Sequence, residues 1–145
     1  MNVKTILAAK ALGGDIISIE PSADLAAVVK LLSEHRIGVV LIRGAGGRLA
    51  GILSERDIVR ALSEHGAAAL SLQVAQVMTR NVATCGEDDS IASIMEQMTA
   101  GKFRHMPVLT KGKLVGLVSI GDVVKQRVDE IEHESEALRD YIRTA

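Results

Sequence analysis

The hydrophobic pattern changes between strand-like and helix-like spacing in the same order twice along the chain. Apolar residues spaced i, i+3, i+4 and i+7 occupy 25–32 and again 91–98, which predicts two amphipathic helices. Each helix follows a short β-rich segment (16–19 and 82–85) and precedes an apolar run, IGVVLI or HMPVL, that predicts a strand. A glycine-containing turn, a third strand and a second helix complete each unit. The pattern predicts a β-α-β-β-α unit, written twice.

The two units are related in sequence as well as in pattern. When 47–59 is laid over 112–124, six of thirteen positions are identical, whereas average residue usage would give about one. The similarity continues upstream, where 16–32 matches 82–98 with a one-residue shift in the turn. Even the lead-in is repeated, because VAQVM resembles VKTIL near the N-terminus. The chain is therefore a tandem repeat.

The size of one copy predicts how the copies are arranged. A unit of about 65 residues buries too little surface to be comfortably stable alone. The expected fold is of the α/β (α+β) class, with two pseudo-symmetric repeats packed through their sheets. The expected division is a first repeat with its lead-in at 1–69, a second repeat with its connector at 70–128, and a C-terminal helical extension at 129–145.

The C-terminal extension carries an apolar stripe on a charged segment. The stripe runs from Val124 through Val128, Ile131 and Leu138 to Tyr141 and Ile142, with one weak turn around Ser135. Such a helix usually packs on another surface. Together with apolar residues that lie off the core stripe of the shorter helices, it predicts a twofold homodimer.

Composition narrows the classes of function. Seventeen basic and eighteen acidic side chains give a net charge of −1, and Trp is absent, so a nucleic-acid-binding surface is not expected. One cysteine, Cys85, leaves no internal disulfide, which favours a reducing compartment. The apolar run at the N-terminus is too short for the apolar region of a signal peptide, so none is expected, and no stretch reaches membrane-spanning length. We therefore expect a cytoplasmic protein with no membrane partner.

Both copies end in Gly-h-h-Ser-x-x-Asp (h, hydrophobic) where the third strand enters a helix. One interpretation is a capping box, although Asp in both copies is shorter than the usual Glu or Gln. The other is a nucleotide site, because a helix N-terminus with a Ser hydroxyl suits a phosphate and an Asp one turn later can accept bonds from ribose hydroxyls. The glycine three residues before each Ser suggests a close approach by another group.

These motifs resemble a known family. ISIEPSADL, HRIGVVLIRGAGGRLAGILSERDIV, VAQVMTRNVATCGEDDSI and KFRHMPVLTKGKLVGLVSIGDVV are similar to a tandem pair of CBS domains, the Bateman module, over residues 3–128. The resemblance implies a regulatory module for energy or redox sensing. It would bind AMP, ADP or ATP, or else NAD(H) or S-adenosylmethionine, in clefts between the repeats. It would need no metal, and it would signal to a regulated protein partner by a conformational or partner change.

The resemblance also assigns roles to individual residues. Asp57 and Asp122 would hold ribose hydroxyls, and Ser54 and Ser119 would meet phosphate. Ser18 with Ile19, and Thr84, would lie near the base. The strand segments that would line the adenine pocket with backbone groups and apolar side chains are Gly38, Val39, Val40 and Arg104, His105, Met106, Pro107.

The two copies are expected to differ as ligand sites. Lys102, Arg104 and His105 would lie near the mouth of the second, whereas the first has only Arg36 there. Arg56 stands between Ser and Asp in the first copy and could reach across the cleft. Since phosphates favour cationic side chains, the second site is expected to be at least as good as the first. Pro107, where the first copy has leucine, fits either an edge strand or a ligand-lining position.

No combination of residues suggests catalysis. Cys85 is expected to be a buried, inert thiol, and His133 to lie on a solvated charged face. A nucleotide-hydrolysing glycine loop is absent, and GAGGR joins two strands rather than a strand and a helix. The chain is therefore not expected to be an enzyme. The alternative to ligand sensing is a structural or protein-interaction dimer without significant ligand binding.

Overall fold

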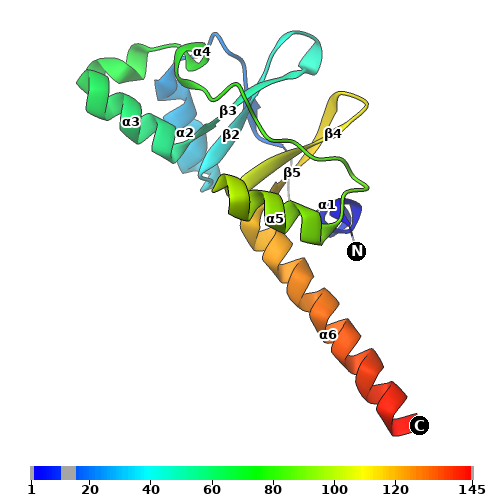
Figure 1. Ribbon diagram of the computed structural model, residues 1–145. Coiled ribbons are helices and arrows are strands. Elements are labelled where there is room, and N and C mark those ends of the chain that lie inside the picture. The colour runs from blue at the N-terminus through cyan, green and yellow to red at the C-terminus, as the bar shows by residue number, and fades with distance from the viewer. Residues whose placement is uncertain (1, 11–15, 145) are drawn as a thin grey trace. The chain divides into compact units, whose positions relative to one another are not determined.

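The computed structural model describes residues 2–10 and 16–144, and their contacts divide the chain into two compact units (Figure 1). One, here called the first-copy unit, comprises Asp15–Ala83 with Lys111–Leu114. The other, the second-copy unit, comprises Met1–Gly14, Thr84–Thr110 and Val115–Ala145. The packing of the two repeats through their sheets stays a prediction.

The first-copy unit contains the predicted β-α-β-β-α order. Its elements are β1 (Ser18–Ile19), α2 (Leu25–His35), β2 (Val39–Arg43), a 3₁₀ turn η1 (Ala45–Gly47), β3 (Leu49–Ser54), α3 (Glu55–His65), a 3₁₀ segment η2 (Gly66–Ser71) and α4 (Val74–Val77). The sheet order is β1-β2-β3, with β1 parallel to β2 and β2 antiparallel to β3. The aliphatic stripe of α2 packs on this sheet, so that Leu25 and Val28 are buried against Val40 and Leu53.

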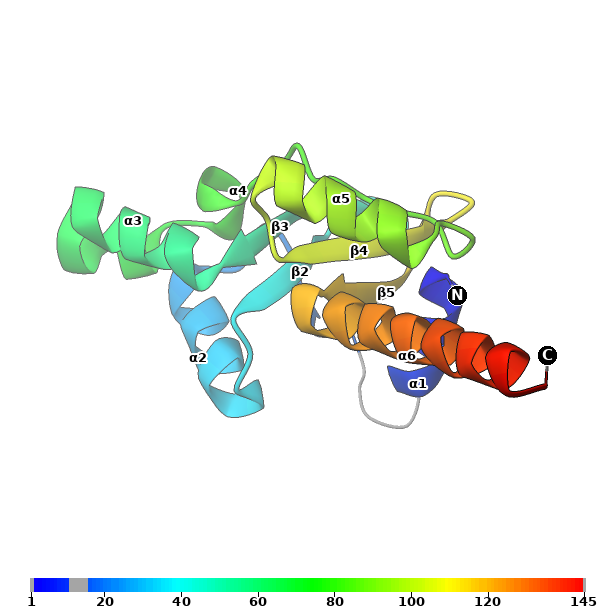
Figure 2. The ribbon, with the colours of Figure 1, turned by 60° about the horizontal axis from the view of Figure 1, so that its bottom comes forward.

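The second-copy unit follows the same plan with a shorter sheet. Its elements are α1 (Val3–Lys10), α5 (Ile91–Gly101), β4 (His105–Thr110), β5 (Lys113–Ser119) and α6 (Ile120–Thr144). The first two residues of β5 are grouped by their contacts with the first-copy unit. Figure 2 shows α5 beside β4, and α6 continuing from the end of β5. The strand predicted at 82–85 is reduced to a parallel bridge between Cys85 and Val108, in which the Cys85 amide donates to the Pro107 carbonyl at 3.0 Å. Since β4 also pairs with β5, it has a neighbour on both sides there and is not an edge strand at Pro107.

The repeated lead-ins explain the glycines of the two motifs. Each lead-in packs on the third strand of a copy: α1 on the second, and the segment after α4 on the first. A Cβ atom at Gly51 would lie 2.6 Å from the Thr79 carbonyl oxygen, and one at Gly116 would lie 2.5 Å from a methyl group of Leu7. The close approach suggested by these glycines is made by the lead-ins. The contacts thus group α1 with the second-copy unit, whereas the division expected from the sequence placed it with the first repeat.

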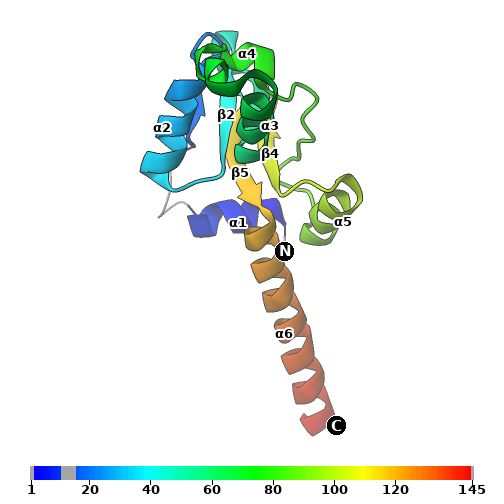
Figure 3. The same ribbon diagram turned by 90° about the vertical axis from the view of Figure 1, so that its left-hand side faces the viewer.

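The C-terminal helix α6 is continuous over 25 residues. The weak turn expected around Ser135 does not interrupt it. Val123 is its one buried residue among those described, and every residue from 131 to 144 is exposed. Figure 3 shows the distal half of α6 extending with no other element of its unit beside it. The predicted helical extension is therefore a helix with an unpacked outer half.

Candidate functional site: two Ser-x-x-Asp junctions

In the first copy, Ser54 and Asp57 form a capping box at the start of α3. The Ser54 amide donates to Asp57 Oδ2 at 2.9 Å, and the Asp57 amide donates to Ser54 Oγ at 3.3 Å. Aspartate is therefore long enough for this cap, contrary to the reservation drawn from its length. The Arg60 guanidinium binds Oδ1, so both carboxylate oxygens of Asp57 are engaged, one by the N-cap residue and one by its own helix.

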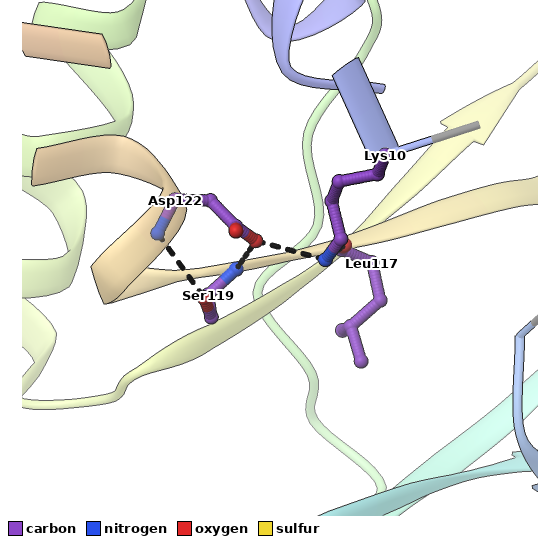
Figure 4. A network of polar contacts seen from close by, with 4 residues as sticks. All are labelled: Lys10, Leu117, Ser119 and Asp122. Carbon is purple, nitrogen blue, oxygen red and sulfur yellow. Dashed lines mark hydrogen bonds and ion pairs between the residues drawn. The ribbon is translucent and has the colours of Figure 1, made fainter. Parts of the chain in front are cut away.

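In the second copy, Ser119 and Asp122 make the same two bonds at the start of α6. The Ser119 amide donates to Asp122 Oδ2 at 2.9 Å, and the Asp122 amide donates to Ser119 Oγ at 3.2 Å. Here the cation is Lys10, at the end of α1. Its ammonium lies 2.8 Å from Asp122 Oδ2 and donates to the Leu117 carbonyl at 2.9 Å (Figure 4). Among the described residues, none bonds Asp122 Oδ1, which leaves that oxygen able to accept.

The predicted base-lining strands lie directly beside these junctions. The Glu55 amide donates to the Gly38 carbonyl at 2.9 Å, and the Ile120 amide donates to the Arg104 carbonyl at 2.8 Å. The start of each strand is thereby fixed to the first turn of each helix. Since the first and third amides of both helices are engaged, fewer N–H groups remain for a phosphate than a free helix N-terminus would offer.

Charges around Asp122 form a cluster in the second-copy unit. Burial raises the pKa of Asp122, but the hydrogen bonds from Lys10 and Ser119 outweigh it, so the pKa lies below its usual value. Burial and the nearby Lys10 ammonium lower the pKa of His105, with Arg104 adding to the effect and Asp122 opposing it. The structure therefore brings the predicted Arg104, His105 and Asp122 together, and it adds Lys10.

The other predicted residues fall into two groups. The exposed or half-buried residues, which a ligand could meet, are Ser18, Ile19, Gly38, Arg56, Thr84, Lys102, Ser54 and Ser119. Val39, Val40, Met106 and Pro107 are buried. Val40 and Met106 belong to the hydrophobic cores of their units. At those two positions the strand has only its main chain to offer, and not the apolar side chains that were expected to sandwich a base.

Lys10 and Arg60, the two cations on the carboxylates, were missed by the sequence analysis. Arg60 had a local signal, because a residue three positions after Asp57 on a helix lies on the same face. Lys10 had a weaker one: Leu7 is the repeat equivalent of Met78, and Lys10 lies one turn beyond it. The helix α4 ends at Val77, whereas α1 continues to Lys10, and this extra turn brings the ammonium to Asp122.

Two further candidates show no site chemistry. Burial, with a smaller contribution from Asp89, raises the pKa of the Cys85 thiol to about 11, which makes it a poor nucleophile. No group of three or more metal-ligating side chains occurs in the described part of the chain. The helices within residues 2–10 and 16–144 include none that is long and apolar enough to span a membrane.

Comparisons with known proteins identify the family. The CBS domain model matches residues 9–64 and 74–129. A mitochondrial CBS domain-containing protein of Arabidopsis thaliana is 34% identical over 79% of this chain, which spans 58% of that protein's length. The crystal structure of a CBS-domain containing protein from Agrobacterium tumefaciens is 41% identical, covers 87% of this chain and 92% of its own, and superposes with a TM-score of 0.81.

A third comparison concerns a protein with a bound ligand. The CBS domain pair of protein MJ0100 is 25% identical, with a TM-score of 0.76 over 90% of this chain and 98% of that one. It was crystallised in complex with 5-methylthioadenosine and S-adenosyl-L-methionine. Two matched repeats, two Ser-x-x-Asp junctions and these relatives agree: the chain belongs to the CBS-domain family.

Proposed function

We propose that this chain is a regulatory module that binds an adenosine ligand at its Ser-x-x-Asp junctions and has no catalytic activity of its own. AMP, ADP or ATP are the ligands proposed first, with NAD(H) and S-adenosylmethionine as further members of the same class. Binding would then change the conformation of the module or its contact with a protein partner. The proposal places the stronger site in the second-copy unit.

The observation that carries the proposal is the state of Asp122. Its carboxylate is charged at neutral pH, as an ordinary aspartate is, and the hydrogen bonds from Lys10 and Ser119 lower its pKa further. Its side chain is 26% exposed, against 10% for Asp57. A vicinal diol can donate two hydrogen bonds to a carboxylate, as a ribose does. Lys10, His105 and Arg104 supply positive or polar groups around it, which favours a ligand that also carries phosphate.

Two finer parts of the proposal concern assembly and location. We propose a homodimer, because apolar side chains such as Val59, Leu62 and Val124 are exposed on α3 and α6. A cytoplasmic location stays a prediction, and one relative is described as mitochondrial. The alternative function is a structural dimer without useful ligand affinity, which the capping boxes favour, since they give Ser and Asp a purely structural role.

Titration calorimetry of the full chain with AMP, ATP, NADH and S-adenosylmethionine tests the proposal. Asp122→Asn keeps an oxygen for the Ser119 amide but loses the charge, so the helix cap is retained while affinity should fall about tenfold or more. Asp24→Asn is the matched control, because Asp24 caps α2 outside either motif. If none of the four ligands binds the native chain, the structural dimer is the better function.

A further inference from the structure

Among the described residues, the helix α6 exposes a row of large apolar side chains along one face. Its apolar members are Val124, Val128, Ile131, Leu138 and Ile142, which are between 44% and 66% exposed. With Ser135 they are defined here as the α6 stripe. A helix segment of about fourteen residues with no tertiary packing is only marginally stable in water. Something that covers this stripe would stabilise the outer half of α6.

The spacing of the α6 stripe identifies the kind of cover. Its members are separated alternately by four and three residues, which is the heptad spacing of a coiled coil and differs from the broader face that packs on a globular core. Val128, Ser135 and Ile142 occupy a positions, and Val124, Ile131 and Leu138 occupy d positions. Val128 and Ile142 at a and Leu138 at d match the residue types that favour two parallel strands, whereas Val124 and Ile131 at d are β-branched.

The flanking charges select the orientation. Lys125, Glu132 and Arg139 occupy e positions, and Arg127 and Glu134 occupy g positions. In a parallel pair of identical helices, each g residue faces the e residue five positions later in the partner. Arg127 then meets Glu132 of the partner subunit, and Glu134 meets Arg139 of the partner subunit. Both contacts are attractive, and the twofold symmetry doubles each of them.

In the antiparallel arrangement that overlaps the whole stripe, charged residues at the e and g positions meet residues of like charge instead. This arrangement places Glu134 against Glu134 of the partner subunit, and Glu132 against Glu132 of the partner subunit. Lys125 then faces Arg139 of the partner subunit as well. Since like charges at these flanks select against a pairing, the charge pattern favours the parallel one. Arg127 already lies along α6 in an ion pair with Glu130 at 2.7 Å, and its guanidinium has donors left for a second carboxylate.

From spacing and charge together, we propose that α6 forms a parallel, in-register, two-stranded coiled coil with α6 of a second copy of this chain. This goes beyond the homodimer proposed above, because it names the surface and its direction. It does not depend on ligand binding. The outer face of α6 suits exposure in such a dimer, since its b, c and f positions include Asp129, Glu136, His133 and Asp140.

Disulfide trapping tests the register. In the parallel pair, residue 135 lies opposite its own copy, so Ser135→Cys should form a disulfide-linked dimer under mild oxidation. His133→Cys, two residues earlier on the outer f face, is the matched control and should remain largely monomeric on a non-reducing gel. The native Cys85 is buried with a raised pKa and will contribute little. Equal trapping of the two variants, or trapping of neither, overturns the proposal.

A charge exchange tests the direction. Glu134→Arg places arginine against Arg139 of the partner subunit, so the dimer dissociation constant, measured by light scattering or sedimentation, should rise about tenfold. Glu134→Arg with Arg139→Glu restores attraction in the parallel dimer and should recover native affinity. In the antiparallel dimer the single change only replaces one like pair by another, so no weakening would overturn the proposal. A native chain that is monomeric at high micromolar concentration would do the same.

Discussion

The two Ser-x-x-Asp junctions share their backbone geometry and differ in the origin of the cation that binds the carboxylate. In the first copy it is Arg60, three residues along the same helix, and in the second it is Lys10, 112 residues away in the sequence. A cation on the same helix as its carboxylate does not link that helix to another element. One carried by a separate helix holds that helix against the site, so only the second junction ties a lead-in to its carboxylate.

The same difference decides what each carboxylate can still accept. Both oxygens of Asp57 are engaged, one by the N-cap residue and one within α3, whereas Asp122 concentrates its bonds on Oδ2. A ligand at the first copy would have to displace an arginine of the same helix. At the second it could use Oδ1 while Lys10 stays in place. If the junctions bind a ligand as proposed, the second copy is expected to have the larger share of the affinity.

The largest expected effect is a loss of stability when a lead-in can no longer pack closely on the third strand of its copy. Gly51→Ala places a Cβ against the main-chain oxygen of Thr79, which is held in a bridge with Ile52 by hydrogen bonds of 3.0 and 2.9 Å. Since backbone cannot move aside cheaply, unfolding free energy should fall by about 2 kcal/mol, roughly 4–8 °C in Tm.

Gly116→Ala is the matched variant in the other unit. Its Cβ meets the end of the Leu7 side chain, which can change rotamer, so the loss should be less than about half as large. Chemical denaturation of both variants measures the difference. Equal losses would mean that the lead-ins do not pack on the two copies in the way described.

The next prediction compares ligand affinity after removal of each of the two cations that bind the carboxylates. Lys10→Met removes the ammonium from Asp122, so the affinity for AMP should fall about tenfold while the affinity for adenosine changes little, because only the phosphate would use the charge. Arg60→Met is the control and should leave AMP binding nearly unchanged. Calorimetry with both ligands provides the measurement. If AMP binds the native chain and Lys10→Met lowers the affinities for AMP and adenosine equally, Lys10 supports Asp122 without meeting phosphate.

Features that depend on local sequence were predicted, and those that depend on tertiary contacts were not. Periodicity located the helices at 25–32 and 91–98, because these aliphatic stripes are local and pack against their own strands. Ser54 and Ser119 were recognised because the cap is also a local pattern. Lys10 was missed because its contact depends on the tertiary placement of α1. The glycines were recognised as sites of close approach, but the approaching group could come only from the structure.

The smallest expected effect is on the pH dependence of stability and involves His105. The equivalent residue in the first copy is Val39. Burial and Lys10 lower the folded-state pKa of His105 from 6.5, so the unfolded chain takes up the proton first as the pH falls. The stability that depends on neutral His105 is complete above about pH 6.5 and is lost as the pH falls from there toward the folded pKa. His105→Gln should reduce that slope, and in NMR titrations the His105 midpoint should rise in Lys10→Met, because Asp122 then acts on it without the opposing ammonium. A midpoint at or above 6.5 in the native chain would contradict the charge cluster, and with it the electrostatic difference between the two copies.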